Sequence, residues 1–193
     1  MKTKIMMIST MVICLVAFLT FSTYAQEIEI RGGGSYITLS DDDAPDGGFG
    51  FYVGGKYNIF DDLNAIGQYE KYFISETIDD VDVDIDLNAI LGLASFDLMP
   101  ENQTNISLMG GPGFYFGSLS VKEGGMEISF NLESSLGLKF GAALEHKLVE
   151  DINLNIGGFY RILEMGIEID DFPTDEEGDF SGLEFNGGLS YSF

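Results

Sequence analysis

The sequence predicts an all-β chain that folds as an eight-stranded antiparallel up-and-down transmembrane β-barrel. Eight segments alternate apolar and polar residues, as strands with two different faces do. The chain ends on one such segment, Ser181–Phe193, and its last residue is an aromatic on the apolar face. After residue 25 no stretch approaches the about 18 apolar residues of a membrane helix. A membrane location would therefore require a closed barrel, since only helices and closed sheets satisfy every backbone group in lipid.

The N-terminal segment has the pattern of a secretory signal peptide. Lys2 and Lys4 precede an apolar run from residue 5 to residue 21, and the small residue Ala25 follows. This order predicts cleavage after Ala25. Residues 1–25 are thus the expected signal peptide and residues 26–193 the expected barrel domain. The alternative is a membrane-anchoring helix, which the polar residues inside the run and the missing positive flank disfavour.

The composition excludes several classes of function. Loss of two lysines and no acid with the signal peptide takes the formal charge from −23 to −25. Such a charge repels phosphates, so no nucleic acid is expected as a partner. The expected mature chain has no cysteine for disulfides or thiolate metal sites. Its single histidine, His146, argues against a multi-histidine metal centre. No cofactor is expected.

The eight alternating segments are long enough and numerous enough for a barrel. Each reaches the about 9 to 11 residues of a membrane strand, and an even number is typical of bacterial single-chain barrels. The segments are Glu27–Ser40, Gly48–Phe60, Asn64–Ser75, Val81–Leu98, Thr104–Ser118, Glu127–Lys147, Ile152–Leu163 and Ser181–Phe193.

Within each segment we assign the apolar face to lipid and the polar face to the interior. In the fourth segment the odd-numbered residues 81–93 are all apolar, and the even-numbered residues 82–88 are acids or asparagine. In the sixth segment the same rule points Leu132 to lipid and Glu133 inward. The inverse assignment would describe a soluble barrel of the lipocalin type. Glycine-rich polar faces and the closing aromatic favour lipid outside, because small residues suit a crowded interior.

The predicted connections alternate between short and long, as tight periplasmic turns and longer outer loops do. The short ones are Asp61–Leu63, Met99–Gln103 and Leu148–Asp151. The longer and more acidic ones are Asp41–Gly47, Glu76–Asp80, Leu119–Met126 and Glu164–Phe180. Both termini are then periplasmic. The long sixth segment and Val81–Ile85 are expected to extend above the bilayer as a protruding sheet edge.

Three stretches carry a family resemblance: Thr23-Tyr24-Ala25 at the signal end, Gly110-Gly111-Pro112-Gly113 within a strand, and Gly187–Phe193 at the closing strand. With them the chain resembles the small outer-membrane β-barrel family of the OmpA/OmpX type. The resemblance implies a bacterial outer-membrane protein, exported by its signal peptide and in contact with lipid and lipopolysaccharide. It also implies recognition by the barrel-assembly machinery through the C-terminal residues Leu189, Tyr191 and Phe193.

Two features depart from that family. The chain has no tryptophan for the aromatic girdles. Lys71 falls on the assigned lipid face of the third segment, where a charge is costly near the midplane. Lys71 is therefore expected either near the outer rim or beside a bulge that shifts the register.

The polar faces collect charges of both signs, and these are the candidate site residues. They are Glu29, Arg31, Lys56, Glu70, Glu133, Lys139, Glu145, Arg161 and Glu184. The lumen of an eight-stranded barrel is narrow and filled by side chains, and buried charges require partners. We expect a salt-bridge network that plugs the barrel. The alternative is a gated ion path through the same residues.

Two further groups have simpler interpretations. Carboxylates in the acidic runs at residues 41–46, 79–86 and 170–179 are of the type that binds Ca²⁺. Their spacing is not that of an EF-hand, which favours solvated outer loops and no metal site. His146 is a candidate general base, but no nucleophile motif accompanies it. Its position at the end of the sixth segment favours an interfacial polar residue.

The sequence thus predicts a non-enzymatic structural or surface-interaction protein with a plugged lumen and outer loops that meet the environment. The alternative is a narrow channel or carrier for small molecules. A carrier for apolar molecules would need an apolar lumen, whereas the assigned inner faces are mostly glycine, serine, asparagine and charged residues. An enzyme is the least favoured class, because no catalytic set converges.

Overall fold

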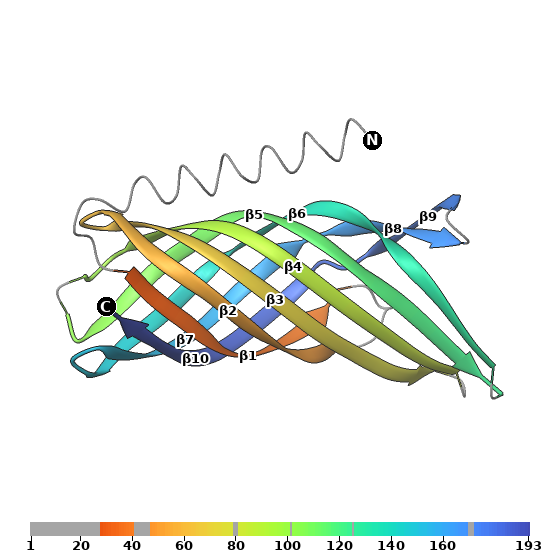
Figure 1. The fold of residues 1–193 in the computed structure, drawn as a ribbon, viewed down its shortest axis with the longest axis horizontal. Helices are drawn as coiled ribbons and strands as arrows, with labels where there is room; N and C mark the ends of the chain where they lie inside the picture. The colour runs from red at the N-terminus through yellow and green to blue at the C-terminus, as the bar shows by residue number, and fades with distance from the viewer. Residues whose placement is uncertain (1–27, 41–46, 79–80, 101, 125, 170–171) are drawn as a thin grey trace.

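The computed structural model is an antiparallel β-barrel with steeply tilted strands (Figure 1). It describes residues 28–40, 47–78, 81–100, 102–124, 126–169 and 172–193, so the predicted signal peptide lies outside the described residues. The strands are β1 (Ile28–Leu39), β2 (Gly47–Phe60), β3 (Leu63–Ile78), β4 (Val81–Asp97), β5 (Thr104–Glu123), β6 (Met126–Val149), β7 (Ile152–Ile162), β8 (Glu164–Ile169), β9 (Phe172–Asp179) and β10 (Gly182–Ser192).

Eight of these strands form the closed wall, which confirms the predicted fold class. Strands β1 to β7 pair in sequence order, and β10 pairs with both β7 and β1. All of these pairs are antiparallel. Closure pairs β10 with β1, so neither the first nor the last strand of the wall is left as a free edge. Both described chain ends, at Ile28 and Phe193, lie at one end of the barrel, which we call the periplasmic end.

The segment Glu164–Phe180, predicted as an outer loop, forms the hairpin β8–β9. Its register continues that of β7–β10, since Asp179 opposes Glu164 just as Gly182 opposes Arg161. The two parts are one long hairpin with a break at Leu163 and Phe180. Acids, glycine and proline in this stretch are typical of a loop, but the backbone hydrogen bonds of the continuing ladder override that preference.

The outer ends of β3, β4, β5 and β6 extend beyond the β1–β2 hairpin, as Figure 1 shows on the right. We call residues 75–78, 81–86, 118–123 and 126–131 of these strands the outer sheet. It includes most of Glu76–Asp80 and Leu119–Met126, which were predicted as loops and are largely strand. Cross-strand bonds reinforce the ladder here, such as Thr77 Oγ1 donating to Asp82 Oδ1 at 2.7 Å.

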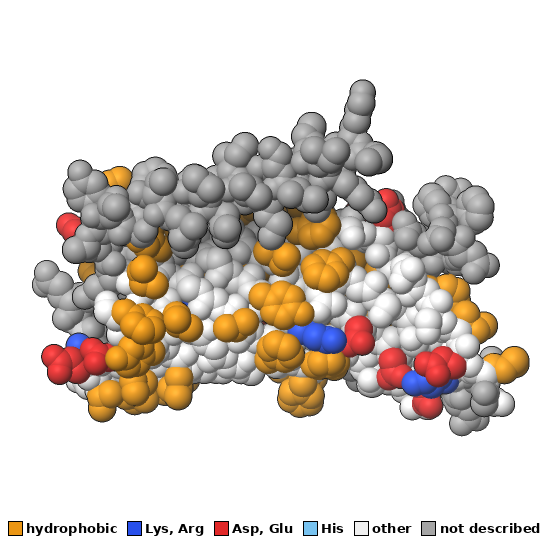
Figure 2. All heavy atoms as spheres, in the orientation of Figure 1, with side chains coloured by type: hydrophobic (Ala, Val, Ile, Leu, Met, Phe, Trp, Pro, Cys, Tyr) orange, Lys and Arg blue, Asp and Glu red, His pale blue; other side chains and the backbone are white. Residues whose placement is uncertain are grey.

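The outer surface of the barrel carries an apolar belt. Large apolar side chains point away from the interior on the strands of the wall, and Figure 2 shows them spread along the face in view. They include Ile30, Phe51, Val53, Phe73, Ile90, Phe96, Leu108, Leu138, Phe140, Ile156, Leu183, Phe185 and Leu189. So much exposed apolar area on a closed barrel is stable in lipid and not in water. No helix among the described residues is long and apolar enough to cross a membrane.

The face assignment of β4 was wrong. Leu91 is 2% exposed in the interior, whereas Ile90 is 52% exposed toward lipid. A one-residue slip exchanges the two faces of a strand, and near residue 90 both faces are apolar, so alternation alone does not distinguish them. The odd-numbered face also carries Ser95 and Asp97, which need the polar interior. The even-numbered acids 82–86 lie instead on the outside of the outer sheet.

A β-bulge in β6 reverses the predicted faces of Leu132 and Glu133. Tyr115 of β5 opposes Ser135, but Gly117 opposes Leu132, so β6 contains one extra residue between them. The extra residue reverses the alternation beyond it. Leu132 is therefore buried and Glu133 is exposed, which is the reverse of the prediction for both residues.

Lys71 has no bulge beside it, because β3 keeps an unbroken register against β2 and β4 at that position. Its ammonium lies 3.6 Å from Asp86 Oδ1 and 4.7 Å from the centre of the Phe73 ring. An acidic partner on the outer sheet indicates that Lys71 marks the outer rim of the apolar belt.

The reversed face of β4 can be tested with nitroxide labels, because the expected mature chain has no cysteine of its own. We expect a label on Ile90→Cys to show high accessibility to oxygen dissolved in the bilayer. A label on Leu91→Cys should be shielded, since Leu91 lies in the interior. Electron paramagnetic resonance in lipid vesicles measures both accessibilities. If the label at residue 91 were the more accessible one, the odd-numbered face of β4 would point to lipid, as the sequence predicts.

Candidate functional site: the barrel interior

The barrel interior has two charged clusters and an apolar outer part. The periplasmic cluster comprises Glu29, Arg31, Lys56, Asp97 and Glu145, and the central cluster comprises Glu70, Tyr72, Lys139 and Glu184. Eight of the nine predicted interior residues are in or beside these clusters. Glu133 is the exception, because the β6 bulge turns it outward.

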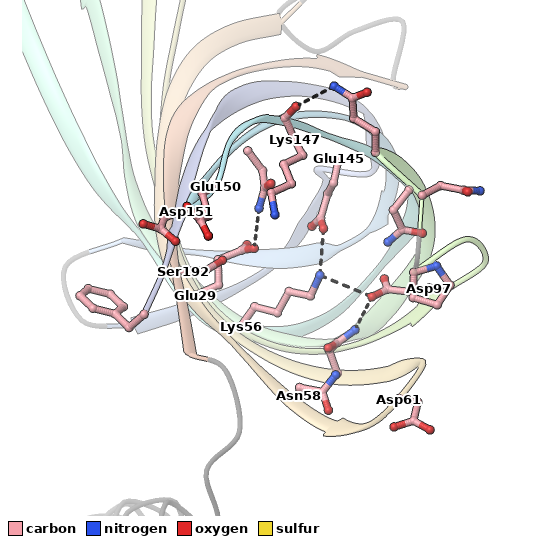
Figure 3. Close-up of a pocket in the computed structure, with 17 residues that line it drawn as sticks. Glu29, Lys56, Asn58, Asp61, Asp97, Glu145, Lys147, Glu150, Asp151 and Ser192 are labelled. Carbon is pink, nitrogen blue, oxygen red and sulfur yellow. Dashed lines mark hydrogen bonds and ion pairs between the residues drawn. The ribbon is translucent and has the colours of Figure 1, made fainter.

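Lys56 of β2 is the centre of the periplasmic cluster (Figure 3). Its Nζ lies 2.9 Å from Glu145 Oε2 and 3.6 Å from Asp97 Oδ2. Arg31 Nη1 lies 3.8 Å from the other oxygen of Glu145. Two cations thus share the carboxylate of Glu145, which keeps these buried charges paired.

Asp97 belongs to this cluster but is not among the interior residues predicted from the sequence. Asn64 Nδ2 donates to its Oδ2 at 3.0 Å, and Ser107 Oγ donates to its Oδ1 at 2.6 Å. The error in the faces of β4 hid this residue, since Asp97 shares a face with the apolar residues that were assigned to lipid. The signal that was present is the polar pair Ser95 and Asp97 at the end of that face.

The central cluster crosses the lumen from three strands. Lys139 of β6 contacts the carboxylate of Glu70 on β3, and its Nζ lies 2.7 Å from Glu184 Oε1 on β10. The Tyr72 hydroxyl lies 2.6 Å from Glu70 Oε2 and 2.7 Å from Glu184 Oε2. All four side chains are at most 1% exposed. The phenol and the ammonium together tie two carboxylates into one bridge across the barrel.

Arg161 holds the break in the long hairpin. Its Nε and Nη2 donate to the carbonyl oxygen of Phe180, at 3.2 Å and 3.0 Å. Its guanidinium also lies 5.2 Å from the Tyr72 ring and 5.5 Å from the Tyr115 ring, which are cation–π distances. Arg161 is therefore a buried brace between the aromatic side chains and a carbonyl in the connection from β9 to β10.

Above the central cluster the interior is apolar, and we call this part the outer plug. It consists of Ile37, Ile74, Ile85, Leu87, Leu132, Leu163, Met165 and Phe180, all of which are buried. This contradicts the expectation that the inner faces are mostly polar, and the cause is the reversed β4. Neither charged cluster continues through the outer plug.

The wall has one interruption beside the outer plug, which we call the wall gap. Pairing of β6 with β7 ends at Leu138 and Ile162, and β6 pairs with β8 only at Asn131 and Leu132. A cavity of about 440 Å³ lies between. It is lined by residues 133–136 of β6 and residues 162–166 of the long hairpin. Leu163 and Met165, which line it, also belong to the outer plug.

The remaining candidates from the sequence are His146 and the acidic runs. His146 Nδ1 lies 2.7 Å from Thr104 Oγ1 across the β5–β6 pair, near the periplasmic end. This is a cross-strand hydrogen bond on the outward face, without a third orienting group. No group of three or more His, Cys, Asp or Glu side chains in the described part of the chain is arranged to hold a metal ion. The acidic run 41–46 lies outside the described residues.

The solved structures that resemble this fold include several outer-membrane proteins. Neisserial surface protein A is 18% identical, with a TM-score of 0.62, over 87% of this chain and 97% of that chain. OprG of Pseudomonas aeruginosa is 15% identical, with a TM-score of 0.63, over 88% and 96%. Ail, the attachment invasion locus protein of Yersinia pestis, is 18% identical, with a TM-score of 0.52, over 87% and 97%. No family model and no curated protein matches the chain.

These likenesses concern only the fold. The evidence for a membrane location is the surface of the barrel. The apolar belt requires a lipid surrounding, and the eight-stranded ring is the architecture of small outer-membrane barrels. The chain is an integral β-barrel protein of the bacterial outer membrane.

Proposed function

We propose that this protein is a non-enzymatic surface-interaction protein, whose outer sheet binds a basic partner above a plugged lumen. The observation that carries the proposal is the outer sheet itself. It extends past the β1–β2 hairpin, and its outward face is acidic. The closed interior beneath it supports binding over transport.

The outward face of the outer sheet combines small hydroxyl residues with an excess of acids. It carries Ser75, Thr77, Asp82, Asp84, Asp86, Ser118, Ser120, Lys122, Glu127 and Ser129. Lys122 is engaged by the acids, since its Nζ lies 2.8 Å from Asp84 Oδ2 and 3.7 Å from Glu127 Oε1. Acidic charge therefore remains available to an approaching cation.

One strand of the outer sheet also has a side without a ladder partner among the described residues. β6 pairs with β5 along Met126–Leu132, but on its other side β8 reaches only Asn131 and Leu132. A strand edge above the membrane accepts an extended peptide through backbone hydrogen bonds. A basic, strand-forming segment matches both the acidic face and this edge.

The charge of this chain distinguishes its expected partner from that of one neighbour. The Yersinia pestis protein Ail has been solved in complex with a heparin analogue, sucrose octasulfate, which is a polyanion. The present chain has a formal charge of −23 over its full sequence, so we infer the opposite preference. The other proposed partners are lipopolysaccharide around the rim and the barrel-assembly machinery. The exposed Leu189, Tyr191 and Phe193 of the closing strand would serve the latter.

A labelled basic peptide of alternating lysine and valine tests the proposed surface. We expect the triple variant Asp82→Asn, Asp84→Asn and Asp86→Asn to bind it at least tenfold more weakly than the parent barrel, because the three carboxylates are the main charges on that face. Fluorescence anisotropy in zwitterionic detergent measures the affinity. The matched control removes three acids at the periplasmic end, Asp61→Asn, Glu150→Gln and Asp151→Asn, and should weaken peptide binding far less.

Acidification gives a second readout of the same binding. The hydrogen bonds that Asp84 accepts from Lys122 and Ser75 hold the pKa of its carboxyl below the usual range. Asp84 thus keeps its charge down to a lower pH than an ordinary Asp, whose pKa is about 3.9. Peptide binding should persist at pH 5 and be lost only below about pH 4. Loss of binding between pH 7 and pH 5, or equal losses in the two triple variants, would contradict the proposal.

The central cluster makes a separate prediction about stability. Lys139→Met leaves two buried carboxylates without their cation, and breaking one partner of a buried pair typically costs about 3 to 5 kcal/mol. We expect a loss of that size in the free energy of unfolding, measured by urea titration in vesicles. The control Lys122→Met removes a cation from an exposed pair and should cost much less. Equal losses would mean that the cluster is not the main brace of the interior.

A second candidate function is a carrier for small apolar molecules, and the wall gap favours it. The gap adjoins the outer plug, and Leu136 beside it is 77% exposed toward the lipid side. An apolar molecule that entered between the strands of the outer sheet would reach lipid through this gap without crossing the charged clusters.

Filling the wall gap tests this second function. We expect Ser135→Trp to occupy the cavity, because Ser135 lines it. If the protein is a carrier, this variant should reduce the uptake of a fluorescent apolar dye to the rate of cells without the barrel. Leu144→Trp, on the lipid face away from the gap, is the control. A wild-type rate equal to that of barrel-free cells would remove the carrier from consideration.

A further inference from the structure

The periplasmic end of the lumen opens into a polar cavity, which we call the vestibule. Its volume is about 530 Å³, within the range of small-molecule sites. The floor is the periplasmic cluster around Lys56, and the rim is formed by the short turns after β2 and β6 (Figure 3). This cavity lies at the opposite end of the barrel from the outer sheet, so it is independent of the proposed function.

The lining of the vestibule is strongly acidic. Six carboxylate side chains contribute to it, and they are Glu29, Asp61, Asp97, Glu145, Glu150 and Asp151. Only Lys56 and Lys147 provide positive charge there. Lys56 is already bound to Glu145 and Asp97. The amide side chains of Asn58, Asn64 and Asn153 add further oxygens.

One carboxylate of the vestibule is buried without a full set of partners. Glu29 is only 7% exposed. Its Oε2 accepts a long hydrogen bond of 3.4 Å from Asn153, and its Oε1 accepts none from any described residue. A buried ionised oxygen without a donor is costly. A donor that enters the vestibule would remove this cost.

We infer that the vestibule binds a small organic cation with two or more ammonium groups, of the linear polyamine class. An ammonium carries three N–H donors and matches both carboxylate and amide oxygens. The acids come from β1, β4, β6, the β2–β3 turn and the β6–β7 turn, so they surround the mouth. Several ammonium groups on one chain reach several of them at once. A metal ion fits less well, because the described residues form no three-ligand group.

Calorimetric titration of the intact barrel with spermidine tests this inference. In zwitterionic detergent we expect saturable binding with one site, weakened by added salt. Glu29→Gln removes the buried charge with little change in shape and should weaken binding at least tenfold. Butylamine, with a single ammonium, should bind at least tenfold more weakly than spermidine. The matched control Glu133→Gln removes an exposed acid outside both the outer sheet and the vestibule, and should bind spermidine like the parent barrel.

A second variant tests the same site in case Glu29→Gln does not fold. Glu150→Gln combined with Asp151→Asn changes only the exposed turn between β6 and β7, and should weaken binding about three- to tenfold. Heat-modifiable migration on gels verifies that each variant is folded. The inference is overturned if folded Glu29→Gln and the turn variant both bind spermidine as the parent does. It is equally overturned if Glu133→Gln weakens binding as much as they do, since the attraction would then be a general effect of net charge.

Discussion

Lys139 bridging Glu70 and Glu184 across the lumen is the interaction on which the rest of the interior depends. The three residues come from β6, β3 and β10, so the bridge ties distant parts of the wall together. An aromatic ring packs on the bridge, since the Phe159 ring lies 4.7 Å from the ammonium. Beside this ring, a Cβ at Gly141 would clash with the β7 backbone at Gly158 and Phe159. Glycine at position 141 is thus required by the close approach of the β7 backbone.

The bridge divides the interior into two environments. Toward the periplasm, the lumen is polar and opens into the vestibule. Toward the cell surface, the lumen is filled by apolar side chains of β3, β4, β6 and the long hairpin. A barrel sealed in this way offers its surroundings two separate surfaces, the outer sheet on one side and the vestibule on the other. The two proposed binding surfaces follow from that division, because both are acidic and neither requires passage through the lumen.

The two-residue period predicts the eight wall strands well, because the period of a strand is independent of the details of packing. This period does not tell which face of a strand points to the interior where the two faces are chemically alike. In β4 the stretch around Ile90 is apolar on both faces, and only the polar residues Ser95 and Asp97 farther along identify the inner one. In β6 a single extra residue reverses the pattern at Glu133, and no local signal announces a bulge. The charged residues of the clusters were identifiable, except Asp97, but their grouping depends on how the wall closes.

The β8–β9 hairpin was not predictable from its sequence for a different reason. Its sequence is acidic and contains glycine and proline, which are typical of loops. The ladder nevertheless continues, because β7 and β10 already place the two chains in register. Strand structure here depends on pairing that lies outside the segment, which a local pattern does not contain.

The central claim is that side chains close the lumen, and single-channel recording in planar bilayers tests it most directly. The account predicts that the purified, folded barrel gives no steady conductance above that of the bare bilayer, at neutral pH and in molar salt. A steady conductance that is weakened by substitutions in the central cluster would contradict it, and would show that the same charged residues line an ion path.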